Sequence, residues 1–104
     1  MSKAQNLKSK FRQSKVWKSF RKKISNKQDN LDPITKSKLR TGFHCHHLDL
    51  NSEHYRELID DNFVCLNKLT HEMIHFAFTY YKKDTQFLDR LKLYLDRMVE
   101  INTN

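Results

Sequence analysis

The chain has 104 residues, of which 38% are hydrophobic and 31% are charged, and its formal net charge is +8. This length predicts one small domain with a modest core, and no apolar run approaches the ~20 residues that span a bilayer. The basic N-terminus lacks the apolar stretch of a secretory signal, and the two cysteines, Cys45 and Cys65, form no C-x-x-C pair. We therefore expect a single domain over residues 1–104 in a reducing, cytoplasmic setting, without membrane contact.

The positive charge is concentrated at the start of the chain. Residues 1–40 hold 13 Lys+Arg and two acids, and residues 41–104 hold seven Lys+Arg and ten acids, so the two parts carry +11 and −3. A basic segment joined to a mildly acidic remainder favours a polyanionic partner such as a phosphate backbone. A solubilising tail is the alternative for the same composition.

A basic helical arm is predicted over residues 1–30. Apolar residues at helical spacing, among them Phe11, Trp17 and Phe20, indicate an amphipathic helix over residues 7–27, with Trp17 and Phe20 in the core. Lys and Arg fill its other face. The side chains expected to contact phosphates here and further along the chain are Lys15, Lys18, Arg21, Lys22, Arg40 and Lys68, with solvated surface charge as the alternative.

The elements after this arm follow from turn residues and apolar periodicity. Pro33 and Gly42 mark a connecting segment over residues 29–42. Beyond it, the patterns predict a strand over 43–48, a loop over 49–61, a strand over 63–66, a helix that ends near Tyr81, and a last helix over 85–101. The segment 43–81 is thus a hairpin with a long loop, followed by a helix, and the expected fold class is α+β.

Four histidines within this segment form a spaced constellation. His46 and His47 are adjacent, Asn62 follows 15 residues after His47, and His71 and His75 complete the set at intervals of nine and four residues. Residues i and i+4 share one face of a helix, so both helical histidines can reach one ion. Three neutral imidazoles suit Zn, Ni, Co or Mn and leave a coordination position open. Adjacent strand residues point to opposite faces, so the tandem pair is expected at a strand end or a bulge.

The residues Phe43-His-Cys-His-His-Leu-Asp and the run from Asn62 to His75 resemble the HNH endonucleases of the ββα-metal fold, with the spacing of the colicin-type DNases. The flanking segments are similar to small HNH proteins of bacteriophages. The resemblance implies a ββα-metal hairpin-plus-helix core over 43–81, flanked by the basic helix and the C-terminal helix. It also implies metal-dependent hydrolysis of DNA phosphodiester bonds, with mainly backbone contacts to DNA, in a bacterial host cytoplasm.

Residue roles follow from the resemblance position by position. It implies that His46, His71 and His75 hold one divalent metal, that His47 is the general base, and that Asn62 holds that base in place across the loop. The colicin-type acid two positions before the pair is replaced by His44. Many HNH proteins that favour Mg²⁺ have an acid at the position of His46, so Zn, Ni, Mn and Mg stay open.

Two other functions fit the same residues. One is a catalytically degenerate HNH fold that binds DNA or assists phage packaging together with a protein partner, although such a module has no need of His47. The other is a structural-zinc interaction module, in which a fourth protein ligand such as Cys45 or His44 closes the coordination shell.

Overall fold

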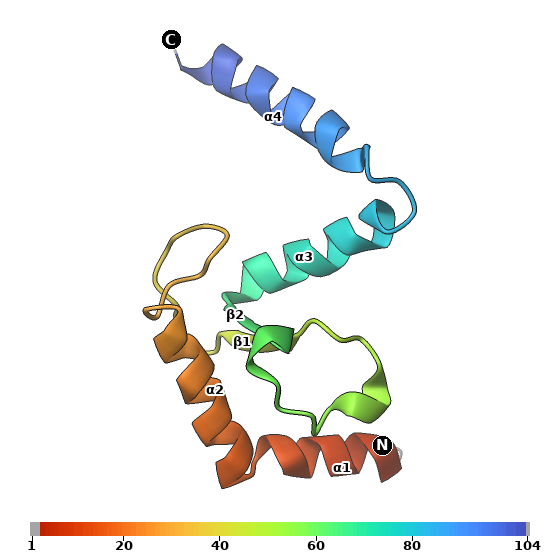
Figure 1. Cartoon of the computed structure of the whole chain (residues 1–104). Coiled ribbons are helices and arrows are strands. Elements are labelled where there is room, and N and C mark those ends of the chain that lie inside the picture. The colour runs from red at the N-terminus through yellow and green to blue at the C-terminus, as the bar shows by residue number, and fades with distance from the viewer. Residues whose placement is uncertain (1–2, 104) are drawn as a thin grey trace. The chain divides into compact units, whose positions relative to one another are not determined.

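The computed structural model of the chain describes residues 3–103, and the side chains of residues 6–103. These residues form an α+β fold with four α-helices and a two-stranded antiparallel sheet, which confirms the predicted class. In chain order the elements are α1 (Lys3–Arg12), α2 (Lys15–Lys27), β1 (His44–His47), β2 (Phe63–Leu66), α3 (Lys68–Tyr81) and α4 (Phe87–Asn102) (Figure 1). Two short 3-10 helices, η1 (Ser52–His54) and η2 (Asp60–Asn62), lie between the strands.

The chain divides into two compact units within α3. The first unit ends at His71 and the second begins at Glu72. Because α3 is continuous from Lys68 to Tyr81, the helix itself carries the chain from one unit to the other. The prediction of one domain over residues 1–104 stays a prediction.

The single helix expected over residues 7–27 is wrong, because the chain breaks at Gln13 and Ser14 to form α1 and α2. Ser14 has extended backbone angles, and its hydroxyl accepts a hydrogen bond from the Trp17 amide at 3.2 Å. Serine favours this N-cap position because its side chain satisfies an amide that the first helical turn leaves unpaired. Phe11 and Val16 are five residues apart, whereas residues on one helix face are three or four apart. This spacing was the sequence signal for the break.

The core of the first unit lies between α2 and the hairpin. Phe20 and Ile24 on α2 are buried against Phe63 and Cys65 on β2, with Leu39 from the connecting segment. The rings of Phe20 and Phe63 meet edge to face with centroids 4.9 Å apart. Burying each large apolar side chain contributes about 1.5–3 kcal/mol, so this cluster fixes the position of the hairpin on α2.

The hairpin forms as predicted, with a shorter first strand. β1 covers residues 44–47 rather than 43–48, and β2 covers 63–66 as expected. The strands pair antiparallel, with Cys45 opposite Cys65 and His46 opposite Val64. The two cysteines are free thiols on the face that packs on α2, as expected for small core side chains.

The segment 29–42 is more ordered than a connector, because the buried side chain of Asp32 organises it. The Asp32 carboxylate accepts hydrogen bonds from the amides of Ile34, Thr35 and Asn67 at 2.9–3.2 Å. Burial alone would raise the pKa of Asp32, but these bonds and one from the Thr70 side chain lower it below its usual value. Asp32 thereby ties the segment to the start of α3.

Replacing Asp32 with asparagine should lower the free energy of unfolding by about 2–4 kcal/mol, because an amide NH2 would face donors that have lost their acceptor. The folded pKa lies below the unfolded value of ~3.9, so the carboxylate stabilises the fold fully above that pH and loses this effect as the pH falls through the folded pKa. Urea unfolding of wild type and variant from pH 7 to pH 3 measures both effects. Equal stability of Asp32→Asn and the exposed control Asp61→Asn would contradict this account.

The C-terminal helix, predicted over residues 85–101, begins two residues later at Phe87 and ends at Asn102. None of its residues is buried. The rings of Phe87 and Tyr80 stack with centroids 5.4 Å apart where the chain leaves α3. Among the residues that the structure describes, no helix combines the length and apolar character required to cross a membrane.

Candidate metal centre

His46 lies at the centre of the candidate site and is held by the pairing of the two strands. It is the third residue of β1, opposite Val64, and only 8% of it is exposed. Strand alternation places His44 and His46 on one face of the hairpin, and Cys45 and His47 on the other. The face of His46 is the one that meets the first turn of α3, because the rings of His46 and His71 lie 4.9 Å apart.

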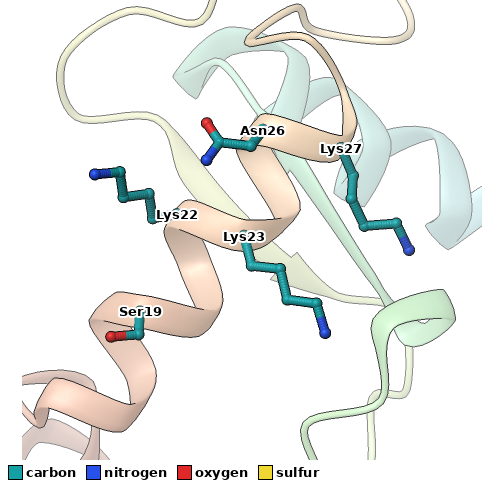
Figure 2. A pocket seen from close by; sticks show the side chains of 5 residues that line it. All are labelled: Ser19, Lys22, Lys23, Asn26 and Lys27. Atoms are coloured by element: carbon teal, nitrogen blue, oxygen red, sulfur yellow. The ribbon is translucent and has the colours of Figure 1, made fainter.

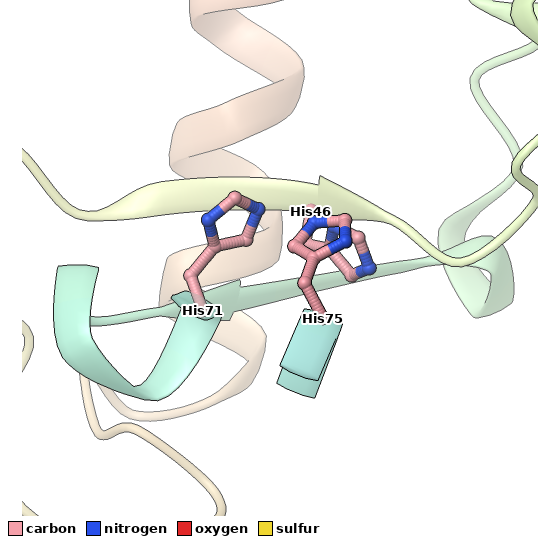
Figure 3. A group of neighbouring side chains, drawn as sticks. All are labelled: His46, His71 and His75. Carbon is pink, nitrogen blue, oxygen red and sulfur yellow. The ribbon is translucent and has the colours of Figure 1, made fainter. Parts of the chain in front are cut away.

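The helix α3 supplies the other two histidines of the group. His71 and His75 are separated by one helical turn, and Figure 3 shows both rings turned toward β1. One ring nitrogen from each of His46, His71 and His75 lies within 4.8 Å of the other two. The structure therefore brings together the three residues that were expected to hold a metal.

The three residues fit a divalent metal ion by chemistry and approximately by distance. Neutral imidazole nitrogens bind zinc and similar ions at ~2.0–2.1 Å, so ligands of one ion lie roughly 3.4 Å apart in tetrahedral geometry. Separations of up to 4.8 Å are close enough for modest side-chain rotations to reach that arrangement. The three residues grade from buried His46 through half-buried His71 to exposed His75, so the group is open to solvent on one side.

His44 contacts the metal group through its neighbour. Its ring is parallel to that of His71 with centroids 4.3 Å apart, so it fixes the plane of the His71 imidazole. His44 lies two residues before His46, so strand alternation places both on the same face of the hairpin.

His47 is the last residue of β1, so the tandem pair lies at a strand end, one of the two places expected, but His47 still faces the other side of the hairpin from His46. The pairing stays regular up to His47 opposite Phe63, without a bulge. The two rings stack with centroids 4.3 Å apart and planes within 8°. The Nε2 atom of His47 is buried and has no hydrogen-bond partner among the described residues. A buried polar atom without a hydrogen-bond partner lowers the free energy of unfolding by about 1–3 kcal/mol.

Asn62 closes the loop between the strands through its backbone. Its carbonyl accepts a hydrogen bond from the Leu48 amide at 2.8 Å, and its own amide donates to the Ile59 carbonyl at 2.9 Å. Leu48 follows His47 directly, so Asn62 fixes the chain where it leaves β1. Both bonds are made by the backbone, so the role that the resemblance implies for the Asn62 side chain stays a prediction.

A second group of possible ligands, which the sequence did not single out, lies in the loop: Asp49, His54 and Glu57. The His54 Nδ1 atom lies 2.6 Å from Asp49 and 3.4 Å from Glu57. The hydrogen bond with Asp49 raises the pKa of His54, and bonds from the Asn51 amide and His54 lower the pKa of Asp49. The bond between His54 and Asp49 already uses a ring nitrogen and a carboxylate oxygen that a metal would need as ligands, which makes this group a poorer metal site than the three imidazoles.

Arg21, one of the expected phosphate contacts, is turned toward the protein instead. Its guanidinium lies 3.6 Å from the centre of the Phe43 ring and donates to the Phe43 carbonyl at 2.6 Å. The side chain is partly buried and anchors the entry to β1. The assignment of Arg21 to nucleic-acid binding is therefore at odds with its placement. Lys15, Lys18 and Lys22 on α2 are exposed.

Two further lysines of α2 line a shallow surface pocket together with Ser19, Lys22 and Asn26 (Figure 2). Lys23 and Lys27 both bind the Asp60 carboxylate, at 3.1 and 3.2 Å, and lower its pKa. These bonds join α2 to the turn before β2, across 33 or more residues of sequence. Charge counting could not have found them, since any acidic residue of the loop was an equal candidate.

Arg40 and Lys68 both line a second pocket of about 390 Å³, which lies at the start of α3. The Arg40 amide donates to the Asn67 side chain at 2.8 Å, and both basic side chains are exposed. Five of the six expected phosphate contacts are thus open to solvent, and Arg21 is the exception.

Comparisons of the chain with protein-family models, with curated proteins and with solved structures found no match.

Proposed function

We propose that the chain is a metal-dependent DNA endonuclease of the HNH type, with a ββα-metal core formed by β1, β2 and α3. The observation that carries the proposal is the convergence of His46, His71 and His75, whose ring nitrogens lie within 4.8 Å of one another. The motif that predicted this convergence also contains His47 and Asn62 at the spacing of a nuclease. A generic zinc site requires neither of them.

His46, His71 and His75 would hold one divalent ion, with Zn, Ni, Mn and Mg as the candidates. When bound, such an ion supplies Lewis-acid stabilisation of the charge that builds up on the phosphate and on the leaving oxygen. The three imidazoles must be neutral to serve as ligands, so acid should weaken metal binding.

His47 acts as the general base in this proposal. Its imidazole would take a proton from a water molecule as the water oxygen attacks the phosphorus. The bond from phosphorus to the 3′ oxygen breaks, and that oxygen takes a proton from solvent, which yields 5′-phosphate and 3′-hydroxyl ends. This role requires the ring to leave its stack on Phe63, and the unpaired Nε2 gains a hydrogen bond when it does.

The first unit would bind the DNA backbone. Residues 1–71 hold 15 Lys+Arg and seven Asp+Glu, a net of +8, so this unit carries the entire net charge of the chain. Lys15, Lys18 and Lys22 form a row on one side of α2, with steps of three and four residues. Contacts of this kind are independent of base sequence and weaken steeply as salt rises.

Supercoiled plasmid tests the proposal. Protein supplied with Mn²⁺, Ni²⁺, Zn²⁺ or Mg²⁺ should convert it to nicked or linear DNA with 5′-phosphate ends, and EDTA should stop the reaction. Raising the salt from 50 to 200 mM should slow cleavage by a factor of about ten or more at limiting protein. Plasmid that stays intact with all four metals, at low salt and neutral pH, would rule the activity out.

A structural-metal module is the second candidate, and the placement of His47 favours it. With its ring packed on Phe63, His47 contributes to the core and not to the face that carries His46. In that case the metal would stabilise the hairpin and α3 without hydrolysing DNA. Metal binding without cleavage is the result that distinguishes this module from the nuclease.

A further inference from the structure

The helix α4 presents an apolar stripe, and none of its residues is buried. Leu88, Leu91, Leu95 and Met98 recur at steps of three, four and three residues, and Tyr94 and Ile101 widen the stripe. These six side chains are 43–68% exposed. A 16-residue helix is marginal in water when it is isolated, because its stability comes from packing of its apolar face. The stripe therefore calls for a partner surface.

The spacing identifies the kind of surface that fits. Apolar residues at alternating steps of three and four form the seam along which two helices pack side by side. At roughly 100 Å² of exposed surface each, the six side chains offer on the order of 600 Å² per chain, close to the ~800 Å² that each partner buries in a standard interface. A helix of the same length and pattern matches this seam best.

The charge of the second unit permits a second copy of the chain as the partner. Residues 72–104 hold five Lys+Arg and five Asp+Glu, a net of zero, whereas the first unit carries +8. The charges of α4 lie off the stripe and pair within the chain, as in Lys92 with Asp96 at 2.6 Å and Arg97 with Glu100 at 3.1 Å. Two copies can therefore join through α4 without bringing like charges together, although their basic units repel.

We propose that the chain forms a homodimer in which the α4 stripes of two copies pack against each other. In a two-fold dimer the same patch serves both partners, so one apolar stripe is sufficient. The interface lies in the second unit, apart from the row of lysines on α2. The dimer thereby joins two basic units, and two histidine groups, in one particle.

Mass measurement by light scattering or sedimentation on the full chain tests the dimer. The wild type should have twice the chain mass of 12.6 kDa at about 100 µM and dissociate on dilution. Leu91→Glu, which buries a charge in the seam, should be monomeric at that concentration. The matched control Leu93→Glu changes an exposed leucine on the opposite side of α4 and should stay dimeric.

Leu91→Ala keeps the helix and removes only packing, so it should raise the dimer dissociation constant about tenfold or more while the circular dichroism stays unchanged. The Leu91→Ala variant therefore provides the test if Leu91→Glu fails to fold. A wild type that stays at 12.6 kDa at about 100 µM would overturn the proposal. So would dimers that survive both Leu91 substitutions, since the interface would then lie elsewhere.

Discussion

Replacing His47 with alanine should lower kcat for plasmid cleavage by a factor of about 10²–10⁴, the usual contribution of a positioned general base. Metal binding should be unaffected, because His47 is on the strand face opposite His46 and is not one of the three converging imidazoles. Cleavage kinetics at saturating metal, with calorimetric metal titration of the same protein, measure both quantities.

His54→Ala is the matched control for this substitution. It removes an imidazole from the same loop region, but His54 binds Asp49 and Glu57 instead of the metal group. Its cleavage rate should stay within about a factor of three of wild type. Equal rates for His47→Ala and wild type would show that His47 serves only the core, where it stacks on Phe63.

The second large effect is expected at the metal ligands. His71→Ala should weaken binding of Zn²⁺ or Ni²⁺ by at least about 100-fold, since even loss of an outer contact to a ligand costs 10–100-fold. His71 is the middle member of the group and contacts the ring of His46. Cleavage should be lost with the metal. Calorimetry of metal-stripped protein gives both the affinity and the number of ions per chain.

The His44→Ala variant tests whether His44 is itself a metal ligand or only supports the ligand His71. His44 stacks on His71 at 4.3 Å, so its removal should loosen the ligand and weaken metal binding about tenfold, much less than loss of His71 itself. If His44→Ala weakens binding as much as His71→Ala, then His44 is itself a ligand and the coordination shell is closed by protein. That outcome would favour the structural module.

Local periodicity predicted the parts of the site that depend on one element or on neighbouring strands. His71 and His75 share a helix face because four residues make one turn, and β2 was predicted with its observed ends. The approach of His46 to His71 depends on the register of the hairpin against α3. The motif spacing implied that register through its resemblance to known nucleases, whereas residue pattern alone did not.

The structure differs from the predictions mainly at side chains whose partners lie far away in sequence. Arg21 was expected at the DNA, but the Phe43 ring and carbonyl offer it a planar partner and an acceptor 22 residues away. Asp32 stands beside Pro33 in the connecting segment, yet its side chain is fully buried and accepts a hydrogen bond from the amide of Asn67, just before α3. The predicted helix over 7–27 includes Ser14 because polar residues between apolar ones are typical of the solvated face of an amphipathic helix.

The claim that one ion at His46, His71 and His75 serves DNA cleavage is tested most directly by titrating metal-stripped protein with Mn²⁺ and following plasmid cleavage. The cleavage rate should rise to a plateau at one ion per chain and stay at background in His71→Ala, with His54→Ala following the wild type. Background rates for the wild type at every metal concentration, or full activity in His71→Ala, would contradict the claim.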